Sequence, residues 1–200
     1  GAQEAALDVP FSIRKVIGRR AVLELHKDWV LNVGTGIPND VVGGILMEEG
    51  VQDHATLTIE SGIYGGIPKK GIDFGIAKNP FAIIAHDRQF EYYNGAGIDI
   101  TFMGAGEMDE TGNVNATKMG GISPGAGGFI DITSTAKNVV FCSTFTGSGL
   151  EVDFNEEQGV VIRQEGRFQK LVKQVQQVSY NAQRGLSIGQ TGPLENRTAK

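Results

Sequence analysis

Two adjoining segments, Trp29-Val-Leu-Asn-Val33 and Gly34-Thr-Gly-Ile-Pro38, decide the fold. The first is a short apolar run that predicts a buried strand, and the glycines of the second predict a tight turn directly after it. Helical spacing then follows over residues 41–49, with Asn39 or Asp40 as the expected N-cap. The segment therefore predicts a strand, a glycine-rich turn and a helix in immediate succession.

A second buried strand is expected directly after this helix. Residues 55–59 combine β-branched and apolar side chains, and Glu60 closes the run. Strand, helix and strand in this order predict a parallel pair with a right-handed crossover. Ahead of the first strand, apolar residues recur at helical spacing from Ile13 to Leu25, and Ser12 is the expected N-cap of that helix.

The remainder of the chain indicates more strands and several glycine-rich loops. Strands are expected over 98–103 and 139–145, and a hairpin-like turn at 109–113. Residues 61–80 and 120–128 are expected to be loops. The predicted fold class is α/β, with an open mixed, largely parallel sheet and flanking helices.

The composition excludes several classes of protein. The 200 residues include 29 glycines without a fixed period, and the net charge is -5. Residues 1–162 hold 11 Lys and Arg against 21 Asp and Glu, whereas residues 163–200 hold 7 against 2. The basic residues after 162 are dispersed, which is typical of a solvated face. An acidic chain of this kind does not favour a nucleic-acid partner.

Neither disulfide nor metal chemistry is expected. Cys142 is the single cysteine and lies in an apolar run, so a buried, inert thiol is expected. The three histidines, His26, His54 and His86, are too scattered to predict a metal site. The apolar runs are too short for a membrane helix, and the start shows no export signal. A cytoplasmic location is therefore expected, with an organelle matrix as an alternative.

Two glycine motifs invite functions that the neighbouring residues disfavour. Gly34-x-Gly36 resembles the start of a dinucleotide fingerprint, but Asn39 stands where the third glycine should be. Gly121-Ile-Ser123-Pro-Gly125 has the spacing of a nucleophile elbow. That elbow needs the N–H group of the residue after serine, and a proline has none.

Glu60 is the most informative candidate residue. It ends a predicted buried strand, and Gly62, Gly65 and Gly66 follow it. In open α/β folds the carboxyl ends of the strands bind ligands, so a carboxylate there can act as a nucleophile. Nearby glycines let backbone N–H groups approach a developing oxyanion, and residues 125–129 could form another such wall. The simpler alternative is an exposed acid at the end of a strand.

Five segments in this order resemble the carboxyl-terminal half of the family I coenzyme A transferases, and are most similar to the propionate/acetate CoA-transferase group. They are Asn32-Val-Gly-Thr-Gly-Ile-Pro38, Thr58-Ile-Glu60-Ser-Gly62 with Gly65-Gly66, Gly95-Ala-Gly-Ile-Asp-Ile-Thr101, Gly112-Asn-Val-Asn115, and Gly125-Ala-Gly-Gly-Phe-Ile130. The resemblance implies a CoA-transferase-like fold over residues 1–200. It also implies a missing amino-terminal half, and hence an incomplete enzyme.

The resemblance implies a ping-pong transfer of coenzyme A between a short-chain acyl-CoA and a carboxylic acid, through a glutamyl-CoA thioester on Glu60. It places the acyl and CoA pocket at Gly34, Gly36, Gly125, Gly127 and Gly128. Coenzyme A is then a substrate, and no metal or other cofactor is expected. The implied partners are the two substrates, an amino-terminal half or subunit, and further copies of the chain.

Two departures from the family pattern are visible. Ile63 replaces a proline found in many members, which we expect to alter the preference for acyl size. Residues 192–200 stop short of the closing strands of the family. Two other functions remain open: a sugar-phosphate isomerase-like enzyme with Glu60 as general base, and a non-catalytic subunit whose partner holds the active site.

Overall fold

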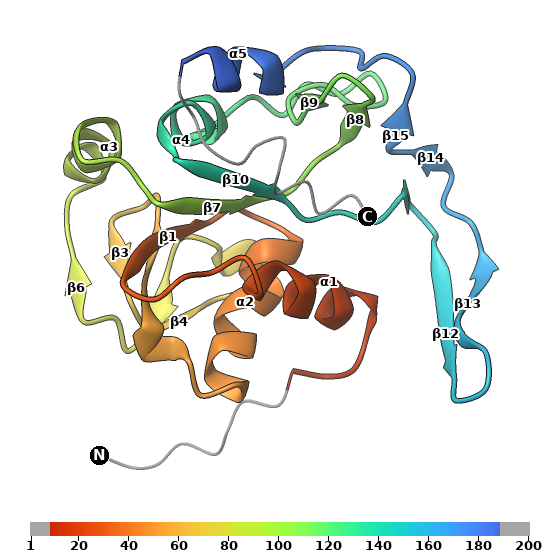
Figure 1. Ribbon diagram of the computed structural model, residues 1–200, viewed down its shortest axis with the longest axis horizontal. Helices are drawn as coiled ribbons and strands as arrows, with labels where there is room; N and C mark the ends of the chain where they lie inside the picture. The colour runs from red at the N-terminus through yellow and green to blue at the C-terminus, as the bar shows by residue number, and fades with distance from the viewer. Residues whose placement is uncertain (1–8, 189–200) are drawn as a thin grey trace.

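A computed structural model describes residues 9–188, and its centre is a six-stranded sheet (Figure 1). The strand order is β10-β7-β1-β2-β3-β6. The first four strands of that order run parallel, β3 pairs antiparallel with β2, and β6 pairs antiparallel with β3. The strands are β1 (Trp29–Val33), β2 (Ala55–Ile59), β3 (Ile63–Tyr64), β6 (Ala82–Ile83), β7 (Ile100–Met103) and β10 (Asn138–Phe141). The predicted mixed, largely parallel α/β sheet is confirmed.

Helices cover both faces of this sheet (Figure 1). Helices α1 (Ile13–Val22) and α2 (Ile37–Glu48) lie on one face, and α3 (His86–Gly95) and α4 (Phe129–Thr135) lie on the other. Side chains alternate between the two faces along each strand. In β7, Phe102 therefore joins the core beneath α1 and α2, whereas Met103 joins the core beneath α3 and α4. Because both faces of the sheet are buried, its central strands are apolar, and this pattern allowed them to be predicted from the sequence.

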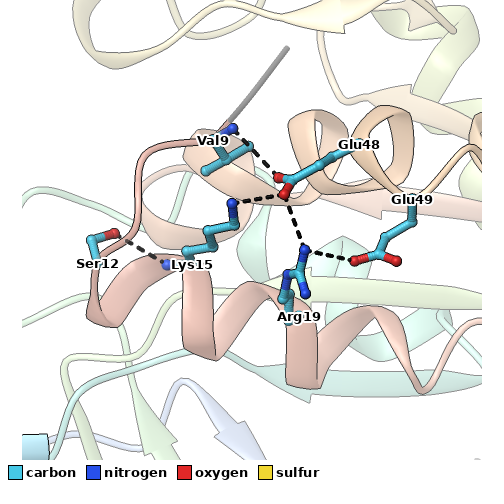
Figure 2. A network of polar contacts seen from close by, with 6 residues as sticks. All are labelled: Val9, Ser12, Lys15, Arg19, Glu48 and Glu49. Carbon is cyan, nitrogen blue, oxygen red and sulfur yellow. Dashed lines mark hydrogen bonds and ion pairs between the residues drawn. The ribbon is translucent and has the colours of Figure 1, made fainter. Parts of the chain in front are cut away.

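A cluster of charged side chains joins α1 to α2 (Figure 2). Lys15 Nζ lies 2.7 Å from Glu48 Oε1, and Arg19 Nη2 lies 3.0 Å from the same oxygen. The amide group of Lys15 donates to Ser12 Oγ, so the predicted N-cap of α1 is confirmed. The hydrogen bond from Lys15 lowers the pKa of Glu48, with Arg19 acting in the same direction.

The predicted start of the second helix is wrong. Helix α2 begins at Ile37, with Gly36 as its N-cap, and Pro38 lies in its first turn. A proline is tolerated there because the first N–H groups of a helix have no partner within it. Asn39, one of the two expected caps, instead donates its Nδ2 to the carbonyl oxygen of Lys69 at 2.6 Å.

Residues 61–80 are more regular than the predicted loop. They contain β3, β4 (Ile67–Pro68) and β5 (Ala77–Lys78), besides a short 3-10 turn at Gly71–Asp73. Each strand is two residues long, so none carries the alternation on which a sequence prediction depends. A further 3-10 turn, at Gln52–His54, leads into β2.

Short ladders make up the carboxyl-terminal part, and all are antiparallel except the parallel pair of β15 with β8. β8 (Glu107–Asp109) and β9 (Asn113–Asn115) form the predicted hairpin and belong to a sheet of order β15-β8-β9-β16. A second hairpin, β12–β13, extends away from the body (Figure 1). The elements not yet bounded are β11 (Thr146–Gly147), β12 (Glu151–Asn155), β13 (Gly159–Gln164), β14 (Phe168–Gln169), β15 (Leu171–Val172), β16 (Tyr180–Asn181) and α5 (Ala182–Ser187). The segment 192–200, on which the prediction of missing closing strands rests, lies outside the described residues.

Two sequence expectations can be compared with this fold. Cys142 is buried, as predicted, and burial raises the pKa of its thiol to about 12. Within residues 9–188, no helix combines the length and the apolar character needed to cross a membrane.

Candidate active site

A cavity of about 800 Å³ opens at the carboxyl end of the parallel strands. The six residues predicted as a site all line it: Glu60, Gly34, Gly36, Gly125, Gly127 and Gly128. They come from three separate parts of the chain, and the parallel sheet brings them together because its strands end at one edge.

Glu60 reaches this cavity because β2 is fixed in the middle of the sheet. Thr58 pairs with Asn32 of β1, and Ile59 is fully buried. The chain turns immediately after Glu60, where the Gly62 amide donates to the carbonyl oxygen of Ile59 at 3.0 Å. A glutamate in this turn stands at the end of a rigid strand rather than on a free loop.

The Glu60 carboxylate packs against the glycine loop that precedes α4. An ideal Cβ atom built on Gly128 would lie 2.5 Å from Glu60 Oε2 and 2.7 Å from Phe90 Cζ. Burial in this corner raises the pKa of Glu60, and the nearby His86 partly opposes that shift. The carboxylate is therefore partly desolvated, which makes a carboxylate more reactive than it is in water.

Two glycine-containing turns contribute backbone to the cavity wall, one at residues 34–36 and one at residues 125–128. Gly36 has φ +84° and ψ −135°, a conformation open only to glycine, and it forms the N-terminus of α2. Within residues 9–188, the amides of Gly127 and Gly128 have no hydrogen-bond acceptor. Helix N-termini and unpaired amides attract developing negative charge, so both loops suit an oxyanion.

A buried polar layer lies beneath the site. Tyr93 of α3 is fully buried, and its hydroxyl accepts from Asn32 Nδ2 at 3.1 Å and lies 2.8 Å from Thr58 Oγ1. Thr101 Oγ1 donates to Asn32 Oδ1 at 3.0 Å. Burial raises the pKa of Tyr93 to about 12, so it stays a neutral hydroxyl. This layer ties α3 to β1, β2 and β7 below the Glu60 turn.

Two cations in the cavity wall were missed by the sequence analysis. Lys170 is partly buried there, and Arg14 of α1 lines the same cavity. The prediction that the basic residues after 162 form a solvated face is wrong for Lys170. No local pattern marks it, because its burial depends on contacts with residues far away in the chain.

The predicted effect of Ile63 on acyl size has no geometric support. Its side chain is buried in the core beneath α1 and α2, and it is not among the residues that line the cavity. The wall is instead built partly from Met103, Met119 and Phe74. In the part of the chain that the structure describes, no three His, Cys, Asp or Glu side chains gather as a metal-ligand set.

Known proteins resemble this chain over most of its length. The acetate CoA-transferase YdiF of Escherichia coli strain K12 is 38% identical over 183 residues, which cover 92% of this chain and 34% of that protein. The caffeate CoA-transferase of Acetobacterium woodii is 39% identical over 187 residues, which cover 91% of this chain and 35% of that protein. An acetate CoA-transferase subunit beta of Haemophilus influenzae is 29% identical over 149 residues, which cover 64% of this chain and 60% of that subunit. No family model matches the chain.

A solved structure shares both the fold and the sequence. The thioester complex of the Escherichia coli O157:H7 acyl-CoA transferase YdiF with CoA superimposes with a TM-score of 0.81 at 36% identity, covering 90% of this chain and 33% of that one. The chain thus spans about a third of the length of the first two relatives. By its sequence and its fold, it belongs to the family I coenzyme A transferases.

Proposed function

We propose that the chain carries the nucleophile of a CoA-transferase that exchanges coenzyme A between a short-chain acyl-CoA and a carboxylic acid. One observation carries the proposal: the Glu60 carboxylate stands at the end of β2, partly desolvated and pressed against Gly128, in a cavity with two amide-rich loops. The relatives named as acetate and caffeate CoA-transferases support it, as does the YdiF thioester complex.

The first half of the reaction moves CoA onto the enzyme. A Glu60 oxygen attacks the thioester carbonyl carbon, the C–S bond breaks, and CoA leaves as a thiolate. An acyl-glutamyl anhydride remains. The thiolate then attacks the glutamyl carbonyl, the anhydride C–O bond breaks, and the acyl group leaves as a free carboxylate. Glu60 is now a glutamyl-CoA thioester.

The second half reverses these steps with another acid. Its carboxylate attacks the Glu60 thioester and expels the thiolate, which then attacks the new acyl carbonyl and restores the Glu60 carboxylate. Each attack creates a tetrahedral oxyanion, which the Gly36 turn and the amides of Gly127 and Gly128 would stabilise. No step changes an oxidation state, so the proposed reaction needs no redox cofactor, and coenzyme A is a substrate.

We further propose that the chain works together with an amino-terminal half. The YdiF and caffeate relatives are about three times as long, and a shorter relative is named as a subunit beta. Large apolar side chains are also exposed here, among them Ile72, Phe145 and Phe168. We propose that some of these side chains are covered by that half, since contiguous exposed apolar patches mark interaction sites. The chain together with that half is called the assembled enzyme below. Its association into homo-oligomers and a cytoplasmic location remain expectations.

The decisive experiment traps the glutamyl intermediate. Incubation of the assembled enzyme with acyl-CoA alone should add the mass of CoA, less water, to the peptide that contains Glu60. Borohydride should reduce that thioester to an alcohol at the same residue. The Glu60→Gln variant, assayed before deamidation can occur, should give no adduct and no transfer. Glu91→Gln is the matched control, because Glu91 is an exposed acid on α3 that pairs with Arg88.

Other outcomes would favour the remaining functions. Turnover of a sugar phosphate, abolished by Glu60→Gln but without any adduct, would make Glu60 a general base. Full transfer by the Glu60→Gln variant would mean that the partner polypeptide holds the active site and that this chain is a non-catalytic subunit.

A further inference from the structure

Lys170 lies in the wall of the cavity that Glu60 also lines. Its ammonium group donates to the carbonyl oxygen of Ala105 at 3.3 Å and to Ser143 Oγ at 3.1 Å. Both residues follow the carboxyl ends of central strands, β7 and β10. The loop between β14 and β15 thus places a cation at the same edge of the sheet as the nucleophile.

This cation has spare hydrogen-bonding capacity and no anionic partner. An ammonium group has three N–H donors, and the two contacts above use two of them. Both acceptors are neutral, and among the described residues no carboxylate pairs with Lys170. A partly buried charge is normally paired, because burial without a counter-charge is costly. One donor and the positive charge of Lys170 are therefore left for a ligand.

A second cation reinforces the positive potential. Arg14 lines the same cavity and lies close enough to lower the pKa of Lys170, although burial is the larger cause of that shift. Arg14 is exposed to solvent and pairs with Asp40 of α2, which restrains its position. Among the described residues that line the cavity, the charged ones are these two cations and one acid, Glu60.

Lys170 is bound at the end of a different strand from the one that carries Glu60. Ala105 follows β7, and β7 is separated from β2 by one strand, so the ends of β2 and β7 lie about 10 Å apart at ordinary strand spacing. A substrate whose carbonyl group lies at Glu60 can therefore present a second group to Lys170 across the same cavity.

We propose that Lys170, supported by Arg14, forms a subsite for an anionic oxygen group that a substrate carries at a distance from its reacting carbonyl. This inference rests on the proposed function. Two sources offer that chemistry: the phosphates of coenzyme A, and the second carboxylate of a dicarboxylic acid. The ammonium group would hold either one by a charge-assisted hydrogen bond.

The test uses the assembled enzyme and three variants. Lys170→Met removes the charge while keeping a long side chain, and Lys170→Arg keeps the charge. Lys173→Met is the matched control, since Lys173 is an exposed lysine of the same segment. The first arm compares an acyl-CoA with the same acyl group on pantetheine, which lacks the phosphates. The second compares succinate with butyrate as the acceptor acid.

In one of the two arms, Lys170→Met should raise the KM of the anionic substrate by about tenfold to a hundredfold, the usual effect of losing a charged hydrogen bond. The KM of the matched uncharged substrate and the kcat should change little. Lys170→Arg should recover part of the loss, and Lys173→Met should behave as the wild type. The arm that responds identifies the phosphate or the carboxylate.

Calorimetric titration separates this inference from the proposed function. The Glu60→Gln enzyme, which cannot react, is titrated with CoA, pantetheine, succinate and butyrate, with and without Lys170→Met. A selective loss of CoA or succinate binding supports the subsite even if no transfer activity exists. An unchanged preference for the anionic ligands, with the melting temperature of Lys170→Met also unchanged, would overturn it. If Lys170→Met fails to fold, Lys170→Arg decides: the subsite requires that it still prefer the anionic ligand.

Discussion

Glu60 Oε2 lies 2.5 Å from the position that a Cβ atom on Gly128 would occupy. The two residues can touch only because residue 128 has no side chain. Gly128 directly precedes α4, and Glu60 directly follows β2, so this contact joins two elements that are far apart in sequence. The proposed nucleophile is therefore positioned partly by the absence of a single methyl group.

Gly128→Ala should damage activity more than stability. The new methyl group would meet both the carboxylate and Phe90, so the attacking oxygen must move away from its position. A displacement of this kind should lower kcat by about a hundredfold. Steady-state kinetics and thermal unfolding of the assembled enzyme measure both effects. Gly95→Ala is the control, because a Cβ atom there would meet nothing within 4 Å. Equal activity of the two variants would contradict the positioning role.

The pKa that the acid limb of the pH–rate profile reports should be higher than 4.5, the ordinary pKa of a glutamate. Burial raises the pKa of Glu60, and only the carboxylate can attack, so activity should fall as the pH drops through that raised pKa. The dependence of kcat/KM on pH measures it for the free enzyme. A limb at or below 4.5 would show that Glu60 is not desolvated in solution.

The same burial predicts that Glu60→Gln is more stable than the wild type at neutral pH. The folded state of the wild type holds this proton more tightly than the unfolded state does. Its stability therefore falls as the pH rises from 4.5 through the folded pKa. A neutral amide avoids that loss. Thermal unfolding at several pH values should show that the variant is more stable than the wild type above this pH range and equally stable below it. A gain that does not vary with pH would have another origin.

Tyr93→Phe should destabilise the sheet beneath the site. The change leaves the buried Asn32 amide without the hydroxyl that it donates to, at a cost of about 1–3 kcal/mol. Urea unfolding measures this change in the free energy of unfolding. Tyr92→Phe, on the same helix, provides a comparison outside the polar layer. Equal stability of the two variants would show that the layer contributes nothing.

Glu48→Gln should loosen the pairing of α1 with α2. The hydrogen bond from Lys15 lowers the pKa of Glu48 below 4.5, so its stabilising effect is complete above 4.5 and is lost as the pH falls through the folded pKa. The variant should melt at a lower temperature than the wild type at neutral pH, and the difference should vanish in acid. Glu49→Gln should have a smaller effect, because Glu49 is more exposed and, within residues 9–188, forms an ion pair only with Arg19.

The elements that the sequence predicted well are those with a strong local signal. The strands at β1, β2, β7 and β10 are apolar because both faces of the sheet are buried, and Ser12 is a recognisable cap. Helix α3 was missed because it is largely polar and has only Gln89 and Tyr93 buried. Helix α4 was missed because it is short, with β-branched residues such as Ile132 and Thr133. Their helical state depends on packing against the sheet.

The sequence by itself determined the first two helices and the four parallel strands, the position of Glu60 at a strand end, and the glycine loops that mark the family. These features depend on local patterning and backbone freedom, which the chain carries in its residue types. Only the tertiary structure decided that Gly128 touches Glu60 and that Lys170 lines the same cavity. Such contacts join distant parts of the chain, and they arise because the parallel strands end together at one edge of the sheet.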